Sequence, residues 1–497
     1  MDLVGGLQLG FQNAITLHNI YLCFLGCLWG SIVGVLPGVG PLAGIALLIP
    51  ATYGMDATGA LIMLAGIYYG AMYGGSTTSI LMNIPGESAS VVTCLDGYQM
   101  TKKGRAGAAL FIAAWGSWVG GTLSVVGVML LAPTLANLAM KFGPAEMFAL
   151  LLMAFILLGS VGSSSPLKSA AMLVLGLLVG TVGMDTLTGA HRYTFGIRAL
   201  YDGIDFVPVA MGMFGIGEIL SATEETLVQE CYMPRFRELL PNREELRASL
   251  GPIARGSGLG FFVGLLPGSA HVLSSFLSYA MEKRLAKRPE EFGSGRIEGV
   301  AGPESANNAA TGGAMIPFLA LGIPTGPAIA VMMVALLIHG IRPGPLFISE
   351  QPELFWTLIA SMYIGNVILV ALNLPLVGLF VRLLQIPFRI LFPTILLICL
   401  VGTYSVNLSR FDLLVLLGSG VLGYLFRKLR YDLAPFVLAL IVGPTMEESL
   451  RQTLMRSGGS LSVFWKSPIA LVFIAAAGLL LFWNIRRQLV AARVEAG

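Results

Sequence analysis

Two stretches of this apolar chain place polar side chains next to a proline. The first covers residues 76–83 and continues into Pro85-Gly86-Glu87. The second covers residues 304–311 and is followed by Pro324-Thr325-Gly326. Hydroxyl and amide side chains offer neutral donors and acceptors. A helix broken at proline also frees carbonyl oxygens for a cation and N–H groups for an anion. These stretches therefore suit a small carboxylate that binds together with a sodium ion or a proton.

Two further breaks end ladders of glycine residues spaced four apart. One ladder begins at Gly26 and runs into Leu36-Pro37-Gly38, and the other begins at Gly256 and runs into Leu266-Pro267-Gly268. Position 256 follows position 26 by 230 residues, and this offset holds along both ladders. Small residues at this spacing let helices pack backbone to backbone in a membrane, and the Pro-Gly pair interrupts the helix. Duplicated broken helices indicate the binding site of a secondary transporter.

These patterns define the expected binding site. The residues predicted to bind the substrate or the ion are Pro37, Gly38, Ser76, Thr77, Asn83, Pro85, Gly86, Pro267, Gly268, Ser269, Asn307, Asn308, Thr311, Pro324, Thr325 and Gly326. The alternative is structural, because Ser and Thr also bond back to their own helix and Gly also serves packing alone. For the set Asn307, Asn308 and Thr311, mirrored by residues 76–83, we favour function. No metal is expected beyond a coupling sodium ion.

A histidine and two cysteines carry weaker signals. His271 follows the second break and is able to contact a carboxylate or carry a proton. The equivalent position of the first half is Pro41, so packing at a helix end is an equal alternative. Cys23 and Cys27 share a helix face on which a soft metal would fit, but two packed small hydrophobes are favoured.

The composition predicts an all-α polytopic membrane protein. Of the 497 residues, 56% are hydrophobic and 11% are charged, whereas soluble proteins carry about 25% charged residues. Basic residues flank apolar stretches and are not interleaved with aromatic ones, so the expected surroundings are a lipid bilayer and nucleic acid is not an expected partner.

The charge distribution predicts two inverted-topology repeats. They cover residues 15–221 and 256–450, joined by a cytoplasmic linker at 222–255 and followed by a C-terminal helix and tail at 451–497. The loop after the first Pro-Gly break, residues 53–58, has no Lys or Arg, whereas its counterpart includes Lys283 and Lys287. Under the positive-inside rule these loops fall on opposite sides of the membrane.

The second glycine ladder lies in a segment with basic residues at both ends. Residues 255–283 are about one membrane crossing long, so a single span would leave one basic end outside. A re-entrant helical hairpin with its tip at residues 266–268 satisfies both ends. Inversion then predicts a matching hairpin at residues 25–51, entering from the other side. The alternative is a kinked but continuous helix.

Several of these motifs resemble the large permease subunit of the tripartite tricarboxylate transporters. The resemblance rests on the paired glycine ladders, on the run Gly299-Val300-Ala301-Gly302-Pro303-Glu304-Ser305-Ala306-Asn307-Asn308-Ala309, and on Gly322-Ile323-Pro324. It implies two partners in the bacterial inner membrane system: a small four-helix membrane subunit and a soluble periplasmic solute-binding protein. It also implies uptake of a di- or tricarboxylate, such as a citrate-like acid, driven by an ion gradient. The absence of a Gly-x4-Gly-Lys-Ser/Thr phosphate loop agrees with a process that does not use ATP.

The sequence therefore predicts a secondary active importer with alternating access around a site near the membrane midplane, and no cofactor beyond coupling Na+ or H+. A passive anion channel is the alternative, and it predicts uptake that persists after the ion gradient is collapsed. An intramembrane enzyme would need a nucleophile with a base. With four His residues and no Gly-x-Ser-x-Gly motif, an enzyme is not expected.

Overall fold

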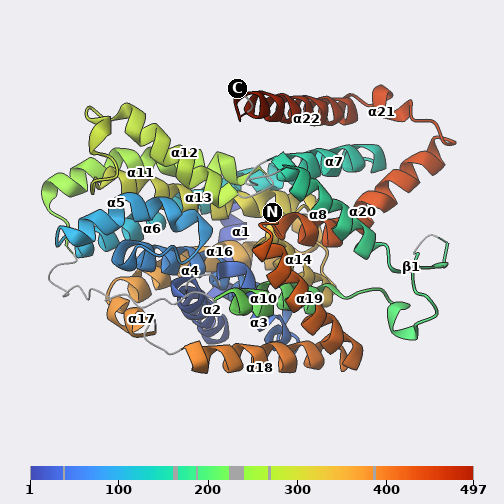
Figure 1. Cartoon of the computed structure of the whole chain (residues 1–497), viewed down its shortest axis with the longest axis horizontal. Helices are drawn as coiled ribbons and strands as arrows, with labels where there is room; N and C mark the ends of the chain where they lie inside the picture. The colour runs from blue at the N-terminus through green and yellow to red at the C-terminus, as the bar shows by residue number, and fades with distance from the viewer. Residues whose placement is uncertain are drawn as a thin grey trace. The chain divides into compact units, whose positions relative to one another are not determined.

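The computed structural model has an all-α fold, as the composition predicts (Figure 1). It describes residues 2–36, 40–160, 166–185, 188–222, 240–266, 270–383 and 388–495. Among these residues the strands form a single antiparallel pair, β1 (Gly183–Met184) and β2 (His191–Arg192). The chain divides into two compact units.

The first unit holds the described parts of Met1–Ala136, Val207–Leu266 and Ala270–Leu425. Its helices are α1 (Leu3–Ala14), α2 (Leu17–Val35), α3 (Gly40–Thr52), α4 (Ala57–Met82), η1 (Ser88–Ser90), α5 (Val91–Lys102), α6 (Ala106–Ala139), α9 (Phe206–Ala210), η3 (Met211–Ile216), α10 (Gly217–Ala222), α11 (Arg243–Gly264), α12 (Ala270–Leu285), η5 (Pro289–Glu291), α13 (Glu298–Leu321), α14 (Pro327–Ile338), α15 (Phe347–Glu350), α16 (Pro352–Asn373), α17 (Val377–Leu383), α18 (Phe388–Asn407) and α19 (Arg410–Lys428).

The second unit holds Asn137–Phe206 and Phe426–Gly497 within the described ranges. Its elements are α7 (Pro144–Ser160), α8 (Pro166–Gly180), β1, β2, η2 (Arg198–Leu200), α20 (Ala434–Arg456), α21 (Val463–Lys466) and α22 (Pro468–Glu495). Inside this unit α8 packs on α20 so closely that a Cβ atom at Gly176 would lie 2.2 Å from the carbonyl oxygen of Phe436.

Both glycine ladders pack directly against the backbone of another helix. On α2, a Cβ atom at Gly26, Gly30 or Gly34 would lie 2.2, 2.5 or 2.1 Å from the carbonyl oxygen of Met63, Ile67 or Ala71 of α4. On α11, a Cβ atom at Gly256, Gly260 or Gly264 would lie 2.3, 2.1 or 2.5 Å from the carbonyl oxygen of Gly302, Ala306 or Ala310 of α13. No side chain fits at such distances, so the predicted backbone-to-backbone packing is confirmed in both halves.

Each ladder helix forms a hairpin with the helix that follows it. The indole nitrogen of Trp29 on α2 donates to the carbonyl oxygen of Gly44 on α3 at 3.1 Å. Fifteen residues of continuous helix would separate these groups by about 22 Å. Arg255 on α11 and Glu282 on α12 form an ion pair with an N–O distance of 2.6 Å, and Figure 1 shows the two helices side by side. The continuous-helix alternative is therefore wrong. The sides from which the hairpins enter a membrane remain a prediction.

The second predicted break in each half is also present. Helix α4 ends at Met82, and Asn83 adopts the left-handed conformation with φ 57°. Helix α13 ends at Leu321, and Gly322 does the same with φ 70°. These two positions match in the two predicted repeats, and each is followed by Ile-Pro. A left-handed residue is a common way to end a helix, and the proline after it prevents the helix from continuing.

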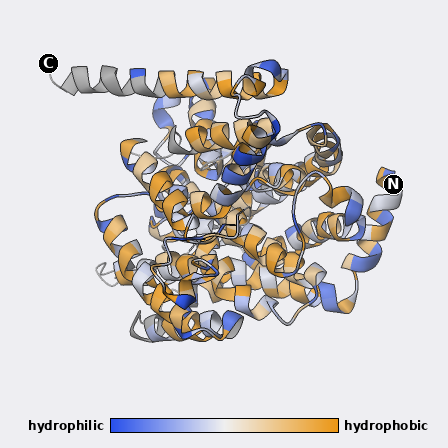
Figure 2. Ribbon diagram, turned by 90° about the vertical axis from the view of Figure 1, so that its right-hand side faces the viewer, coloured by the Kyte–Doolittle hydropathy of each residue, from blue (hydrophilic) through white to orange (hydrophobic). Residues whose placement is uncertain are grey.

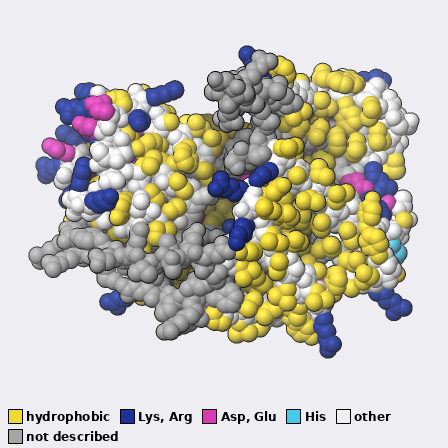
Figure 3. Space-filling view, viewed as in Figure 1, with side chains coloured by type: hydrophobic (Ala, Val, Ile, Leu, Met, Phe, Trp, Pro, Cys, Tyr) yellow, Lys and Arg dark blue, Asp and Glu magenta, His cyan; other side chains and the backbone are white. Residues whose placement is uncertain are grey.

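The outer surface is largely apolar. Within the described ranges three helices are long and apolar enough to cross a membrane, namely α2, α6 and α16, and shorter apolar helices include α3 and α14. Figure 2 shows that hydrophobic residues dominate most helices. On α6, Leu123 and Leu138 are about half exposed. In Figure 3 apolar side chains cover much of the visible face, and charged ones gather over the end of the α11–α12 hairpin. Such exposed apolar surface is expected of a protein that faces lipid.

The predicted linker at 222–255 overlaps the start of the second hairpin. Residues 223–239 lie outside the described ranges. Helix α11 begins at Arg243 with a capping box formed by Asn242 and Glu245, and it continues without interruption into the glycine ladder. The predicted repeat boundary at residue 256 therefore falls inside this helix.

Candidate functional site

A buried carboxyl group on α13 joins three helices of the first unit. The side chain of Glu304 is 1% exposed. One of its oxygens accepts a hydrogen bond from Ser76 on α4, and the other accepts one from Thr93 on α5. The glycine ladder of α11 fixes the neighbouring part of α13, because Gly260 packs against Ala306.

A second buried carboxyl group lies just after the first helix break. Glu87 starts the short helix η1 and accepts the N–H of Ala89 at 2.7 Å. The amide nitrogen of Asn307, on α13, donates to its other oxygen at 3.3 Å. The two predicted polar stretches, one from each repeat, thus meet through Glu87 and Glu304.

These two carboxyl groups have neutral partners. Within the ranges that the structure describes, the hydrogen bonds to Glu87 and Glu304 come from hydroxyl, amide and backbone groups, and no Lys or Arg pairs with either. A buried charge without a counter-charge is unfavourable by several kcal/mol. The arrangement therefore favours the uptake of a proton or another cation at this place.

Two side-chain amide oxygens beside the carboxyl groups accept no hydrogen bond from the described residues. Asn308 donates its amide to Ser117 on α6 at 2.7 Å and to the carbonyl oxygen of Glu304 at 3.1 Å. The side-chain oxygens of Asn307 and Asn308 have no partner among the described residues. By contrast, the hydroxyl of Thr311 donates to the carbonyl oxygen of Asn308 on its own helix at 2.5 Å. For Thr311 this contact fits the structural interpretation, in which a hydroxyl bonds back to its own helix.

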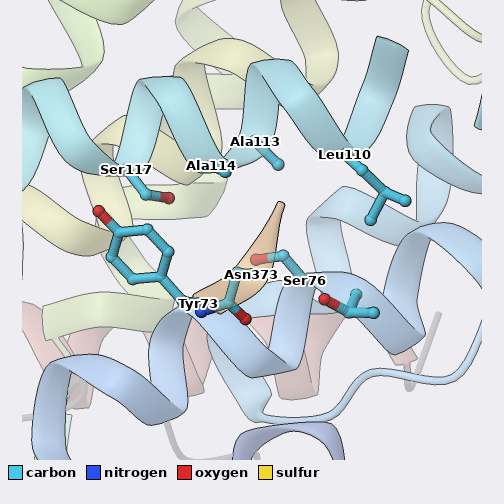
Figure 4. Close-up of a pocket in the computed structure, with 8 residues that line it drawn as sticks. Tyr73, Ser76, Leu110, Ala113, Ala114, Ser117 and Asn373 are labelled. Carbon is cyan, nitrogen blue, oxygen red and sulfur yellow. The ribbon is translucent and has the colours of Figure 1, made fainter. Parts of the chain in front are cut away.

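A small cavity opens next to this cluster (Figure 4). It measures about 10 Å³ and lies between α4, α6 and the end of α16. Its lining consists of Tyr73, Ser76, Thr77, Leu110, Ala113, Ala114, Ser117 and Asn373. A volume of about 10–15 Å³ accommodates one water-sized particle, so a carboxylate does not fit in this conformation.

The structure brings together some of the predicted residues and separates others. Ser76, Asn307 and Asn308 belong to the carboxyl cluster, and Thr77 lines the cavity. Asn83 is exposed, and Thr325 at the start of α14 donates to the carbonyl oxygen of Ala314 at 3.4 Å. The predicted residues at the hairpin tips lie outside the described ranges: Pro37, Gly38, Pro267, Gly268 and Ser269.

The ends of the ladders nonetheless lie beside the helix breaks. A Cβ atom at Gly86 would lie 2.1 Å from the carbonyl oxygen of Gly34 and 2.6 Å from the Cα atom of Gly75. Gly86 therefore packs at the end of α2, and the adjacent Pro85 is half-buried. In the second half, Gly264 packs against Gly313, one turn before the buried Pro317. Pro324 is buried beyond the second break, and Gly326 precedes the first residue of α14.

Several residues of the cluster were not predicted as binding residues. Glu87 and Glu304 stand within the two polar stretches, and their charge in an apolar chain is itself a functional signal. Ser117 and Asn373 carry no such signal, because each is one of several neutral polar residues scattered through an otherwise apolar helix.

His271 and the two cysteines pack against neighbouring helices. The Nε2 atom of His271 lies 2.6 Å from the hydroxyl oxygen of Tyr68 on α4. The thiols of Cys23 and Cys27 each point at a backbone oxygen of α16, those of Ser361 and Gly365. Within the described ranges no group of three potential metal ligands is present. The packing interpretation of the cysteines fits these contacts.

Comparison with known proteins gives one family and two relatives. The model of the family described as "Tripartite tricarboxylate transporter TctA family" matches residues 20–438. The Agrobacterium vitis protein named "Uncharacterized 52.8 kDa protein in TAR-I ttuC' 3'region" is 50% identical over 475 residues, which are 96% of this chain and 95% of that protein. A second A. vitis protein, "Uncharacterized protein in TAR-II ttuC' 3'region", is 51% identical over 211 residues, 42% of this chain and 87% of its own length. No solved structure matches the chain.

Proposed function

This chain belongs to the tripartite tricarboxylate transporter TctA family, and we propose that it is the large permease that imports a di- or tricarboxylate by using an ion gradient. The proposed substrate is a citrate-like organic acid. The proposed partners are a small four-helix membrane subunit and a periplasmic solute-binding protein, and the proposed location is the bacterial inner membrane.

The observation that carries this proposal is the pair of buried carboxyl groups without basic partners. Like charges repel each other more strongly in a protein interior than in water, by roughly 4 kcal/mol at a contact distance of about 4 Å and an effective dielectric constant of about 20. An anionic substrate that approaches Glu87 and Glu304 meets this repulsion unless a cation has neutralised them. Binding of a sodium ion or a proton therefore lowers the free energy of carboxylate binding, which is the physical basis of symport.

The fold offers a route for alternating access. In each half a helical hairpin packs through its glycine ladder against a broken helix, α4 or α13, and these two broken helices carry Ser76, Glu304, Asn307 and Asn308 of the polar cluster. In secondary transporters such interrupted helices surround the substrate near the membrane midplane, and one part moves against the other. Movement of a whole transport domain is an analogy to other hairpin-containing transporters.

The cavity in the described conformation is too small for the proposed substrate. At about 10 Å³ it does not hold a carboxylate, so binding at this place would require a wider conformation. A channel would be expected to hold a continuous water-lined path in its conducting state.

The proposal is tested by uptake into vesicles that contain this chain and both partners. A panel of labelled carboxylates is offered with an inward sodium gradient, an inward proton gradient, or neither. We expect accumulation above the external concentration for one gradient, and its loss when an ionophore collapses that gradient. Uptake that only equilibrates, and persists without a gradient, would establish the channel instead.

Two variants refine this test. Glu304→Gln keeps the shape of the side chain but removes the carboxyl group, and we expect it to abolish accumulation. Glu298→Gln is the matched control on the same helix, because Glu298 pairs with Arg296 in the loop before α13. Exposed ion pairs contribute about 0–1 kcal/mol, so this control is expected to transport normally. Equal transport by both variants would remove Glu304 from the mechanism.

A further inference from the structure

We infer that the cavity between α4, α6 and α16 is a binding site for one sodium ion. The inference rests on the proposed function and deepens it, because it assigns the coupling ion and the residues that hold it. It goes beyond the carboxyl pair, since most of the proposed ligands are neutral oxygens that the sequence does not single out.

The cavity presents oxygen atoms that have no partner. The hydroxyl of Tyr73 and the side-chain oxygen of Asn373 are both unpaired among the described residues, and the two side chains are 3% and 5% exposed. The amide nitrogen of Asn373 donates to Ser31 at 3.1 Å and to the carbonyl oxygen of Leu369 at 3.0 Å. This nitrogen is thus engaged, and the amide keeps its oxygen as the free group. A buried acceptor without a partner is unfavourable by about 1–3 kcal/mol.

Two serine hydroxyls complete the set. Ser76 donates its proton to Glu304, so its lone pairs are left for another partner. Ser117 accepts the amide of Asn308 at 2.7 Å and also borders the cavity. Figure 4 labels Tyr73, Ser76, Ser117 and Asn373 among the residues that line the cavity, with the Tyr73 ring directed toward Ser117.

The charge around the cavity favours a cation over water. None of the residues that line it is basic, and the carboxyl group of Glu304 is separated from it by a single hydroxyl, that of Ser76. A cation in the cavity is attracted by this carboxylate, whereas a water molecule gains much less from it. The ligands are hydroxyl and amide oxygens, which suit hard cations.

The same ligands select a small monovalent ion. Divalent calcium and magnesium are usually held by carboxylates in direct contact, and no carboxylate lines this cavity. The volume of about 10 Å³ corresponds to one water-sized particle, so a single ion without its hydration shell fits, and the comparison of NaCl with KCl described below decides between sodium and potassium. An ion bound here would contact α4, α6 and α16 at the same time. It would also lie next to Ser117, which accepts a hydrogen bond from Asn308, one of the residues predicted to bind the substrate or the ion.

The test measures thermal stability of the purified full-length protein without substrate. The melting temperature is recorded against NaCl concentration, with choline chloride keeping the ionic strength constant and KCl as a second salt. We expect a saturable rise with sodium alone, because an ion that binds only the folded state stabilises it. A melting temperature that responds equally to all three salts would overturn the inference, and a cavity filled only by water gives this result.

Two variants and one control locate the ion. Tyr73→Phe and Ser117→Ala each remove one proposed ligand, and we expect the sodium concentration at half-effect to rise about tenfold. Tyr69→Phe is the matched control, because the Tyr69 hydroxyl is also buried and unpaired on α4 but does not line the cavity. It is expected to respond to sodium as the wild type does. An unchanged response in both ligand variants would overturn the site.

Uptake in vesicles separates this inference from the proposed function. Carboxylate accumulation driven by a proton gradient, without any sodium-specific stabilisation, would overturn the sodium site and leave the importer standing. Sodium-specific stabilisation that both ligand variants weaken, without accumulation of any carboxylate, would support the site and contradict the importer.

Discussion

Replacing one glycine of a ladder with alanine should push α11 away from α13, the helix that carries Glu304, Asn307 and Asn308. In Gly260→Ala the new Cβ atom would lie 2.1 Å from the carbonyl oxygen of Ala306, whereas ordinary contact begins at 3.4 Å. The shortfall is 3.4 less 2.1, or 1.3 Å. Because backbone atoms lie on both sides, no side chain can rotate to make room. Overpacking typically destabilises by about 1–3 kcal/mol, and we expect the upper end of this range or more.

Gly258→Ala provides the matched control on the same helix. A Cβ atom at Gly258 meets nothing within 4 Å, and alanine in an exposed helix is favoured over glycine by about 0.5–1 kcal/mol. This variant should therefore be as stable as the wild type or slightly more stable.

The assay is thermal unfolding in detergent, followed by carboxylate uptake in vesicles. We expect the melting temperature of Gly260→Ala to fall by roughly 5 °C or more and uptake to be lost, because α13 carries Asn307 and Asn308. Equal melting temperatures for the two variants would refute the backbone contact between α11 and α13.

Three further predictions concern the site, the topology and the partners. Asn308→Ala is expected to abolish uptake while leaving membrane insertion intact, because it leaves Ser117 without its amide donor. Thr311→Ala is expected to do the same if the site extends along α13. Wild-type transport in both variants would remove this part of the site. Cysteines introduced at Thr58 and Lys287 should react with an impermeant label from opposite sides of the membrane. The background is a Cys231→Ser variant, in which the remaining cysteines, Cys23, Cys27, Cys94 and Cys399, are buried. Labelling from the same side contradicts inversion. Omission of the periplasmic binding protein should stop transport in vesicles, and undiminished uptake would contradict the three-component assignment.

The sequence predicted the packing and the helix breaks well because both follow from local chemistry. Glycines four apart leave a smooth helix face, so Gly26 and Gly256 already indicate close contact with another helix. A proline cannot continue a helix, so the ends of α4 and α13 before Ile-Pro follow from Pro85 and Pro324.

The partners of each polar side chain could not be predicted in the same way. The hydrogen bond from Ser76 to Glu304 joins residues far apart in the sequence, and no local pattern encodes it. The contribution of Asn373 depends on where the end of α16 lies relative to α4. Thr311 shows the opposite case, in which a hydroxyl in a polar run satisfies its own backbone.

The junction at Glu304 joins α13 to α4 and α5 within the first unit. One side chain of the second half accepts a hydroxyl from each of two helices of the first half, through Ser76 and Thr93. Pulling these helices apart would leave a buried carboxyl group without its donors. Gating motions should therefore keep these three helices together.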